Sequence, residues 1–386
     1  MRPRRWFRLI ALIAAIGLFF AACSTEDDEP ESTGSGTEED GGSDGGSEEP
    51  ADGEPATCQG EAGAEPSQEA VGGSEGDGAG MRVGMVLDIG GVDDDSFNEA
   101  ANTGLQAAAE DFGVEVTYLE PNEDGSNRAE LLRQLATEDY DLVIGVGFLF
   151  AEAMGPLAEE FPDVNFAIID DASLTNANVT PLVFAEEQGS FLVGAAAALA
   201  SGTGNIGFIG GVETELIQKF QAGFEAGVEA INADATVDVR YITQPPDFNG
   251  FADPASARTI AEDMYDSDID VVYHAAGGSG EGLFQAAGGA DRLAIGVDSD
   301  QYQQVEEDIQ PCILTSMLKR VDVAVYSAIE DLINDELEGG TPLTFDLANE
   351  GVGYATDGGQ LDDDIEQLEE LKQQIIDGEI EVPTAP

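Results

Sequence analysis

The sequence predicts an α/β protein with two domains, each built on a parallel sheet covered by helices. Short apolar runs rich in β-branched residues alternate with helical stretches along most of the chain. This alternation is typical of parallel sheets wrapped by helices. In addition, about 300 residues follow Met81, which is more than a single hydrophobic core usually holds.

Residues 1–22 predict a signal peptide, not part of the fold. A cluster of arginines is followed by the apolar run 9–22, which is too short to be a comfortable membrane span. This run closes on Phe20-Ala21-Ala22-Cys23, which resembles a lipobox. We expect Cys23 to become the mature N-terminus and to carry an acyl lipid such as palmitate; an uncleaved signal anchor is the alternative.

Residues 23–80 predict a disordered acidic tether. Gly, Ser, Glu, Asp, Pro and Ala dominate this stretch, and it has almost no large apolar residue with which to build a core. The whole chain is acidic as well, with 14 basic and 79 acidic residues and a net charge of −65. This charge argues against nucleic acid and anionic membrane surfaces as partners, since both require basic patches. An adapted, solvated surface, of which adaptation to a saline habitat is one example, explains the charge better than an acidic active site.

The expected elements then follow in order. Strands are predicted at 83–87, 114–119, 142–146, 166–169, 205–209, 237–242, 271–274 and 294–297, with helices near 96–106, 128–137, 188–200, 213–232 and 254–265. The Gly-containing break at 201–204 indicates where a second sheet begins.

Residues suited to ligand binding recur where these strands end. Asp88 ends the first strand, and Phe97 and Asn98 begin the helix that follows it. Open α/β sheets bind ligands at the carboxyl edge of their strands, so these three residues are expected to share one crevice. Later strand ends and loops supply Asp170, Phe251, Gly277, Asp298 and Lys319. For any single Asp, a role as a helix cap or turn residue is at least as good an interpretation.

Catalysis fits the sequence poorly. The only histidine, His274, ends an apolar strand, and the glycine-rich stretch 277–282 matches neither a dinucleotide-binding fingerprint nor a P-loop. The acidic run 93–95 does not have the spacing of an EF-hand loop. We therefore expect no enzyme activity, no cofactor and no metal.

Two cysteines, Cys58 and Cys312, remain once Cys23 is acylated. Thiols outside the cytoplasm tend to pair, which favours one disulfide between the tether and the body. Two unpaired thiols, with Cys312 buried, are the alternative.

Several blocks between Met81 and Glu369 resemble the basic membrane protein family, nucleoside-binding lipoproteins that serve ABC transporters. These blocks are DIGGVDDDSFNEAANTGLQ, EEQGSFLVGAAAAL, YHAAGGSGEGLFQAA and IGVDSDQY, and they occur in the order found in that family. The resemblance implies a two-lobed fold of the type I periplasmic-binding-protein kind, with the ligand in the cleft between the lobes. Lobe 1 would comprise residues 81–203 and 318–340, and lobe 2 residues 204–317 and 341–386. The strand near 343–347 would cross to lobe 2.

The resemblance also implies roles for the candidate residues. Phe97 would stack on a purine base, and Asp88 and Asn98 would bond the edge of that base. Asp298 would accept the ribose hydroxyls, with Lys319 beside it and Asp170 contributing from lobe 1. Phe251 would supply the second aromatic ring, although Phe248 could replace it.

The expected function is thus that of a lipid-anchored receptor on the extracytoplasmic face of the cell membrane, and we expect it to be a monomer. It would close on a nucleoside and deliver it to an ABC permease. A sugar or autoinducer receptor of the same fold, or a sensory surface protein, is the alternative. Hydrolysis of a nucleoside would require a calcium-binding cluster of carboxylates.

Overall fold

The computed structural model describes residues 53–386. The expected signal peptide, Cys23 and the first part of the tether lie outside these residues. Within the described part of the chain, no helix combines the length and the apolar character that a membrane span needs.

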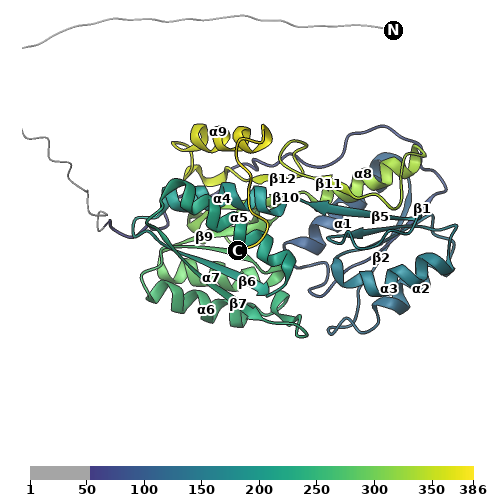
Figure 1. Cartoon of the computed structure of the whole chain (residues 1–386), viewed down its shortest axis with the longest axis horizontal. Helices are drawn as coiled ribbons and strands as arrows, with labels where there is room; N and C mark the ends of the chain where they lie inside the picture. The colour runs from purple at the N-terminus through teal and green to yellow at the C-terminus, as the bar shows by residue number, and fades with distance from the viewer. Residues whose placement is uncertain (1–52) are drawn as a thin grey trace, which may run out of the picture. The chain divides into compact units, whose positions relative to one another are not determined.

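The body contains two six-stranded sheets flanked by helices, which confirms the predicted α/β class (Figure 1). The first sheet is entirely parallel and has the order β11-β5-β4-β3-β1-β2. Its strands are β1 (Arg82–Val86), β2 (Glu115–Leu119), β3 (Leu142–Gly145), β4 (Asn165–Ile169), β5 (Val179–Phe184) and β11 (Leu343–Phe345).

The second sheet has the order β12-β10-β9-β8-β6-β7 and is parallel except for the edge strand β12, which runs antiparallel to β10. Its strands are β6 (Asn205–Val212), β7 (Thr236–Thr243), β8 (Val271–Ala275), β9 (Leu293–Asp298), β10 (Ile313–Lys319) and β12 (Val352–Tyr354).

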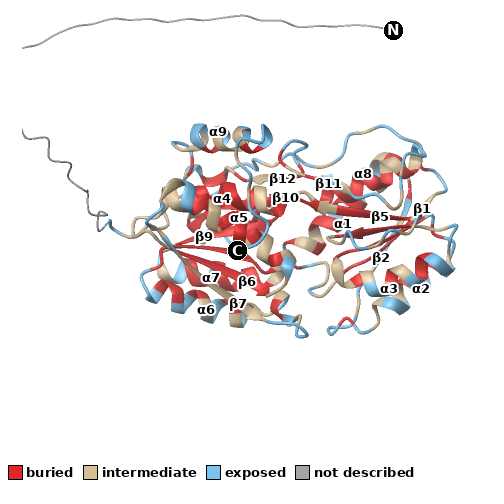
Figure 2. Ribbon diagram, viewed as in Figure 1, coloured by how far each residue is buried: buried red, intermediate tan, exposed pale blue. Residues whose placement is uncertain are grey.

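Helices pack in pairs against the two sheets. In lobe 1, α1 (Phe97–Phe112) packs on α8 (Val321–Ile333), and α2 (Arg128–Thr137) packs on α3 (Ala151–Glu160). In lobe 2, α4 (Glu186–Ala200) packs on α5 (Glu215–Ile231), and α6 (Pro254–Asp266) packs on α7 (Gly280–Ala290). The last helix, α9 (Ile365–Ile376), packs on α4. Strands and inner helix faces form the buried core (Figure 2).

From β1 onwards, the chain passes between the lobes at three places, and two of them differ from the expected boundaries. Helix α4 packs on α5, β10 and β12, so the first crossing lies at Ala185 and not after residue 203. This helix is apolar on nearly all sides, and its sequence therefore does not reveal which sheet it covers. The break at 201–204 is a turn within lobe 2, where Asp270 accepts hydrogen bonds from Ser201 Oγ and the backbone N–H of Gly202.

The other two crossings lie between β10 and α8 and between β11 and β12. The expectation that the strand near 343–347 joins lobe 2 is wrong, because β11 pairs in parallel with β5 of the first sheet. The chain reaches lobe 2 only afterwards, where Val352 of β12 lies opposite Lys319 of β10.

The N-terminal segment, defined as residues 53–80, lies against the body instead of forming a free tether. Its backbone groups and small side chains bond to polar groups of both lobes, and its few apolar side chains, such as those of Ala56 and Val71, pack against the core. The contacts include Ala56 N to Asp270 Oδ2 at 2.9 Å, Ser67 Oγ to Asp357 Oδ2 at 2.6 Å and Ser74 N to Tyr326 Oη at 3.0 Å. Between these points, Arg320 at the second crossing donates to the carbonyl of Glu69 at 3.0 Å. Cys58 and Cys312 are joined by a disulfide in this structure.

Candidate functional site

All eight residues that the sequence singled out for ligand binding line one pocket between the lobes. Its walls enclose about 670 Å³, part of which is open to solvent. This size is within the range of small-molecule sites. The predicted residues are Asp88, Phe97, Asn98, Asp170, Phe251, Gly277, Asp298 and Lys319. They meet because the strands that carry them run parallel within each sheet, which brings the loops at their carboxyl ends to the same edge.

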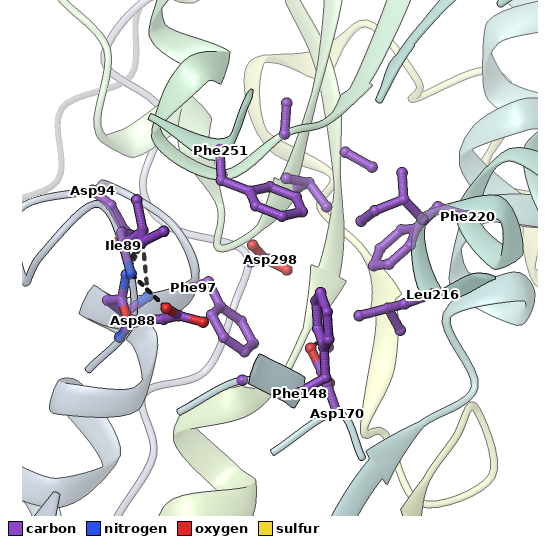
Figure 3. A pocket seen from close by; sticks show the side chains of 18 of the residues that line it. Asp88, Ile89, Asp94, Phe97, Phe148, Asp170, Leu216, Phe220, Phe251 and Asp298 are labelled. Carbon is purple, nitrogen blue, oxygen red and sulfur yellow. Dashed lines mark hydrogen bonds and ion pairs between the residues drawn. The ribbon is translucent and has the colours of Figure 1, made fainter. Parts of the chain in front are cut away.

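Aromatic rings from both lobes surround the pocket (Figure 3). Phe97 begins α1 in lobe 1, and Phe251 ends a short 3₁₀ turn in lobe 2. Phe148 follows β3, and Phe220 lies on α5. Phe248 does not line the pocket, although its ring makes an edge contact with that of Phe148, with 6.1 Å between centroids. Of the two aromatic residues considered for lobe 2, Phe251 is therefore the one in the wall.

Of the two carboxylate oxygens of Asp88, one is hydrogen-bonded within the protein and the other is available to the pocket. Its Oδ1 accepts from the guanidinium of Arg128 and from the backbone N–H of Ile89. Its Oδ2 lies beside Gly147, where a Cβ atom would be 2.8 Å away. Burial raises the pKa of Asp88, and the Arg128 guanidinium opposes this rise. Gly147 has φ of 113° and leaves room for this carboxylate.

The side-chain amide of Asn98 is hydrogen-bonded to the loop that carries Asp88. Its Oδ1 accepts from Asp88 N at 2.8 Å, and its Nδ2 donates to Asp94 Oδ2 at 2.9 Å and to the carbonyl of Ile89 at 3.3 Å. The side chain is buried and its principal donors and acceptor have protein partners. The geometry thus favours a role in holding the loop over the expected contact with a base.

The carboxylate of Asp94 bonds the free donors at the start of helix α1, because the side chain of the N-cap residue Ser96 makes no capping hydrogen bond. This carboxylate accepts from the backbone N–H groups of Ser96, Asn98 and Glu99 at 3.0 to 3.1 Å. These bonds satisfy the free donors at the start of the helix. Ser96 directs its hydroxyl to Asp298 Oδ2 in the other lobe at 2.6 Å.

Lys319 is the buried cation of the pocket. Its Nζ lies 2.6 Å from Asp170 Oδ2, and it also lies over the rings of Phe97 and Phe220, 4.9 and 5.5 Å from their centroids. Burial lowers the pKa of Lys319, but nearby carboxylates including Asp170 and Asp298 more than offset this effect and raise it to about 12. The lysine therefore remains charged at neutral pH.

Two carboxylates of the pocket wall, those of Asp170 and Asp298, have capacity left for a ligand. Asp170 Oδ1 is buried and has no hydrogen-bond partner in the protein. Burial raises the pKa of Asp170 to about 6, although Lys319 opposes the rise, and burial also raises the pKa of Asp298. Both residues adopt positive φ, 67° and 66°, at the ends of their strands. Such backbone strain is frequent at functional sites.

Sequence reasoning missed several wall residues, namely Asp94, Phe148, Leu216, Ile217 and Phe220. The last three lie in the first turns of α5, which follows β6 directly. A helix that starts at the carboxyl end of a parallel strand presents its first turn to the same crevice, and this signal could have identified them.

The histidine considered for catalysis lies away from the pocket, and no metal-binding cluster occurs in the described part of the chain. His274 is buried in β8 and bonds Gln301 Oε1 at 3.0 Å, and burial lowers its pKa to about 4. Between residues 53 and 386, no three His, Cys, Asp or Glu side chains are grouped in a way that could hold a metal ion.

Comparison with known proteins identifies the family. Residues 81–385 match the family model described as ABC transporter substrate-binding protein PnrA-like. The chain is 37% identical over 326 residues to the CD4+ T-cell-stimulating antigen of Listeria monocytogenes, covering 79% of this chain and 88% of that protein. It is 33% identical to the ABC transporter nucleoside-binding protein BmpA of Lactococcus lactis, covering 79% and 89%.

A solved structure gives the same result. The solute-binding protein of an ABC transporter system from Aeropyrum pernix K1 superposes with a TM-score of 0.69 at 30% identity, covering 79% of this chain and 93% of that one. The family consists of transporter substrate-binding proteins, which confirms the prediction that this chain is not an enzyme. The chain belongs to the basic membrane protein family of PnrA-like ABC transporter substrate-binding proteins.

Proposed function

We propose that this substrate-binding protein binds a nucleoside, specifically a purine nucleoside, and delivers it to an ABC permease. The observation that carries the proposal is the pairing of aromatic rings from opposite lobes, Phe97 and Phe251, with carboxylates that retain free oxygens. Stacking on an aromatic side chain contributes about 1–3 kcal/mol per base. Rings from both lobes would therefore favour closure around a planar base.

The polar part of the pocket suits a ribose. Asp170 Oδ1 lacks a partner, and a buried acceptor of this kind requires a donor. Hydroxyls of a nucleoside are such donors. We assign the two vicinal ribose hydroxyls to Asp298, and Asp170 Oδ1 contributes a further acceptor for the ligand. Lys319 balances part of the negative charge. A phosphate would face Asp88, Asp170 and Asp298 with one lysine in the wall to compensate, so a nucleoside suits the site better than a nucleotide.

The name of the Lactococcus relative, a nucleoside-binding protein, supports the same ligand class. The test is calorimetric titration of protein that has been unfolded to remove carried-over ligand and then refolded. We expect binding of guanosine or inosine and no binding of guanosine monophosphate or of arabinose. Binding of the sugar without any nucleoside would refute the proposal in favour of a sugar receptor.

We further propose that the protein is anchored at the extracytoplasmic face of the cell membrane by a lipid on Cys23. The basic start, the short apolar run and the Phe20-Ala21-Ala22-Cys23 sequence support this anchor. Cys23→Ala protein should lose its association with membranes and should not be processed at this position. A mature-sized Cys23→Ala protein that still fractionates with membranes would contradict the proposal.

A further inference from the structure

A second ion pair lies behind Lys319, outside the pocket. Glu186 is the first residue of α4, directly after the crossing from β5, and its side chain is only 1% exposed. Its Oε1 lies 3.5 Å from Lys319 Nζ, and its Oε2 is paired with Lys219 Nζ. Neither Glu186 nor Lys219 lines the pocket, so the role given to Lys319 above does not account for this outer pair.

Lys219 contacts residues on both sides of the crossing from β5 to α4. Its Nζ donates to the carbonyl of Phe184, the last residue of β5, at 2.9 Å, and it lies 3.4 Å from Glu187 on α4. Its neighbour on α5, Phe220, lines the pocket. Lys219 is therefore placed between the ligand site and the first connection of the two lobes.

The charges explain what Lys219 does for Lys319. The ammonium of Lys319 has two carboxylates within reach, Asp170 at 2.6 Å and Glu186 at 3.5 Å. Because Lys219 neutralises Glu186, Lys319 remains closer to Asp170. Without Lys219, Glu186 would be a buried and uncompensated charge, which attracts the nearest cation strongly. That cation is Lys319, and Asp170 would lose its partner.

We propose that Lys219 is a positioning residue of the binding site: by neutralising Glu186 it leaves Lys319 paired with Asp170, and so it sets the affinity for a ligand that it does not touch. This inference rests on the proposed nucleoside-binding function and deepens it. Since Asp170 belongs to lobe 1 and Lys319 to lobe 2, the pair that Lys219 protects also joins the two lobes.

The test measures guanosine binding by calorimetry for the unmodified protein, Lys219→Met and Lys219→Gln. The glutamine variant can still donate to Phe184, so it removes the charge with less disturbance of the crossing. Both variants should bind guanosine about tenfold more weakly, within the range seen when residues that touch no ligand modulate a site. Lys372→Met is the matched control, because Lys372 makes a surface ion pair with Glu369 on α9. It should bind within about twofold of the unmodified protein.

A double variant separates charge compensation by Lys219 from a purely structural role of this residue. Removal of the Glu186 charge should relieve the competition for Lys319, so Glu186→Gln/Lys219→Gln should bind guanosine more tightly than Lys219→Gln alone. A double variant that binds no better than the single one, or Lys219 variants with unchanged affinity, would overturn the inference. Failure of the unmodified protein to bind guanosine would instead overturn the proposed function together with the inference.

Discussion

Asp298 offers the sharpest test of how the pocket would hold a ribose. The residue is only 6% exposed, and its Oδ2 already accepts from Ser96 Oγ at 2.6 Å. The remaining acceptor capacity faces the pocket. Replacement by asparagine preserves the volume and one acceptor oxygen but removes the charge and places two donors where hydroxyl donors are proposed to bind.

The expected loss follows from the number of hydrogen bonds. A hydrogen bond to a charged group contributes about 1.5–3 kcal/mol, and two ribose hydroxyls are proposed to reach this carboxylate. Asp298→Asn should therefore lower the affinity for guanosine by more than about tenfold, since 1.4 kcal/mol corresponds to a factor of ten. 2′-Deoxyguanosine lacks one of the two hydroxyls, so its affinity should fall by a smaller factor.

The assay is calorimetric titration of both ligands into the unmodified protein, Asp298→Asn and the control Ser96→Ala. The control removes the bond between the lobes without altering the carboxylate, so its effect should be the same for both ligands. Equal losses for guanosine and 2′-deoxyguanosine in Asp298→Asn would refute the assignment of this residue to the ribose.

Three further predictions follow from described residues. Phe97→Ala should weaken purine and pyrimidine nucleosides by similar amounts, about 1–3 kcal/mol by calorimetry, because stacking tolerates any base; a loss confined to one base would contradict stacking. Unfolded, unreduced protein should show no reactive thiol at Cys58 or Cys312, and reduction should lower the free energy of unfolding by about 2–4 kcal/mol in denaturant titrations. His274 has a pKa lowered to about 4 by burial, so the folded state binds fewer protons there than the unfolded state, and its stability should fall as the pH decreases from about 6.5 to about 4. Chemical denaturation should give a smaller pH-dependent loss for His274→Gln over this window, and an unchanged slope would refute the role of the histidine.

The sequence predicted the parts of the fold that depend on local pattern. The strands that end at Asp88, Asp170 and Asp298 are short apolar runs, and parallel pairing alone brings their ends together. For this reason, the sequence alone indicates where the pocket lies. Strand β5 was missed because Pro181 lies in its middle, and proline normally argues against a strand inside a sheet.

The sequence could not show which hydrogen-bond partner each polar side chain takes. Asn98 has the same amide whether it bonds a ligand or the backbone of Asp88, and only the three-dimensional arrangement decides between them. The N-terminal segment was misjudged for a related reason. Its composition correctly excludes a core, but its order comes from acceptors far along the chain, such as Asp357 for Ser67.

The position of the N-terminal segment means that the folded body is larger than the part of the chain that its relatives share. The family match begins at residue 81, whereas Tyr302 and Asp357 take hydrogen-bond partners from residues 61–67. A shortened protein that begins at Met81 would lose the cross-link to Cys312 and the hydrogen bonds to Tyr302 and Asp357, each of which contributes about 0.5–1.5 kcal/mol net to stability. For this protein, the boundary of the stable unit therefore lies before Cys58, and a truncation chosen by resemblance alone would remove contacts that stabilise the folded body.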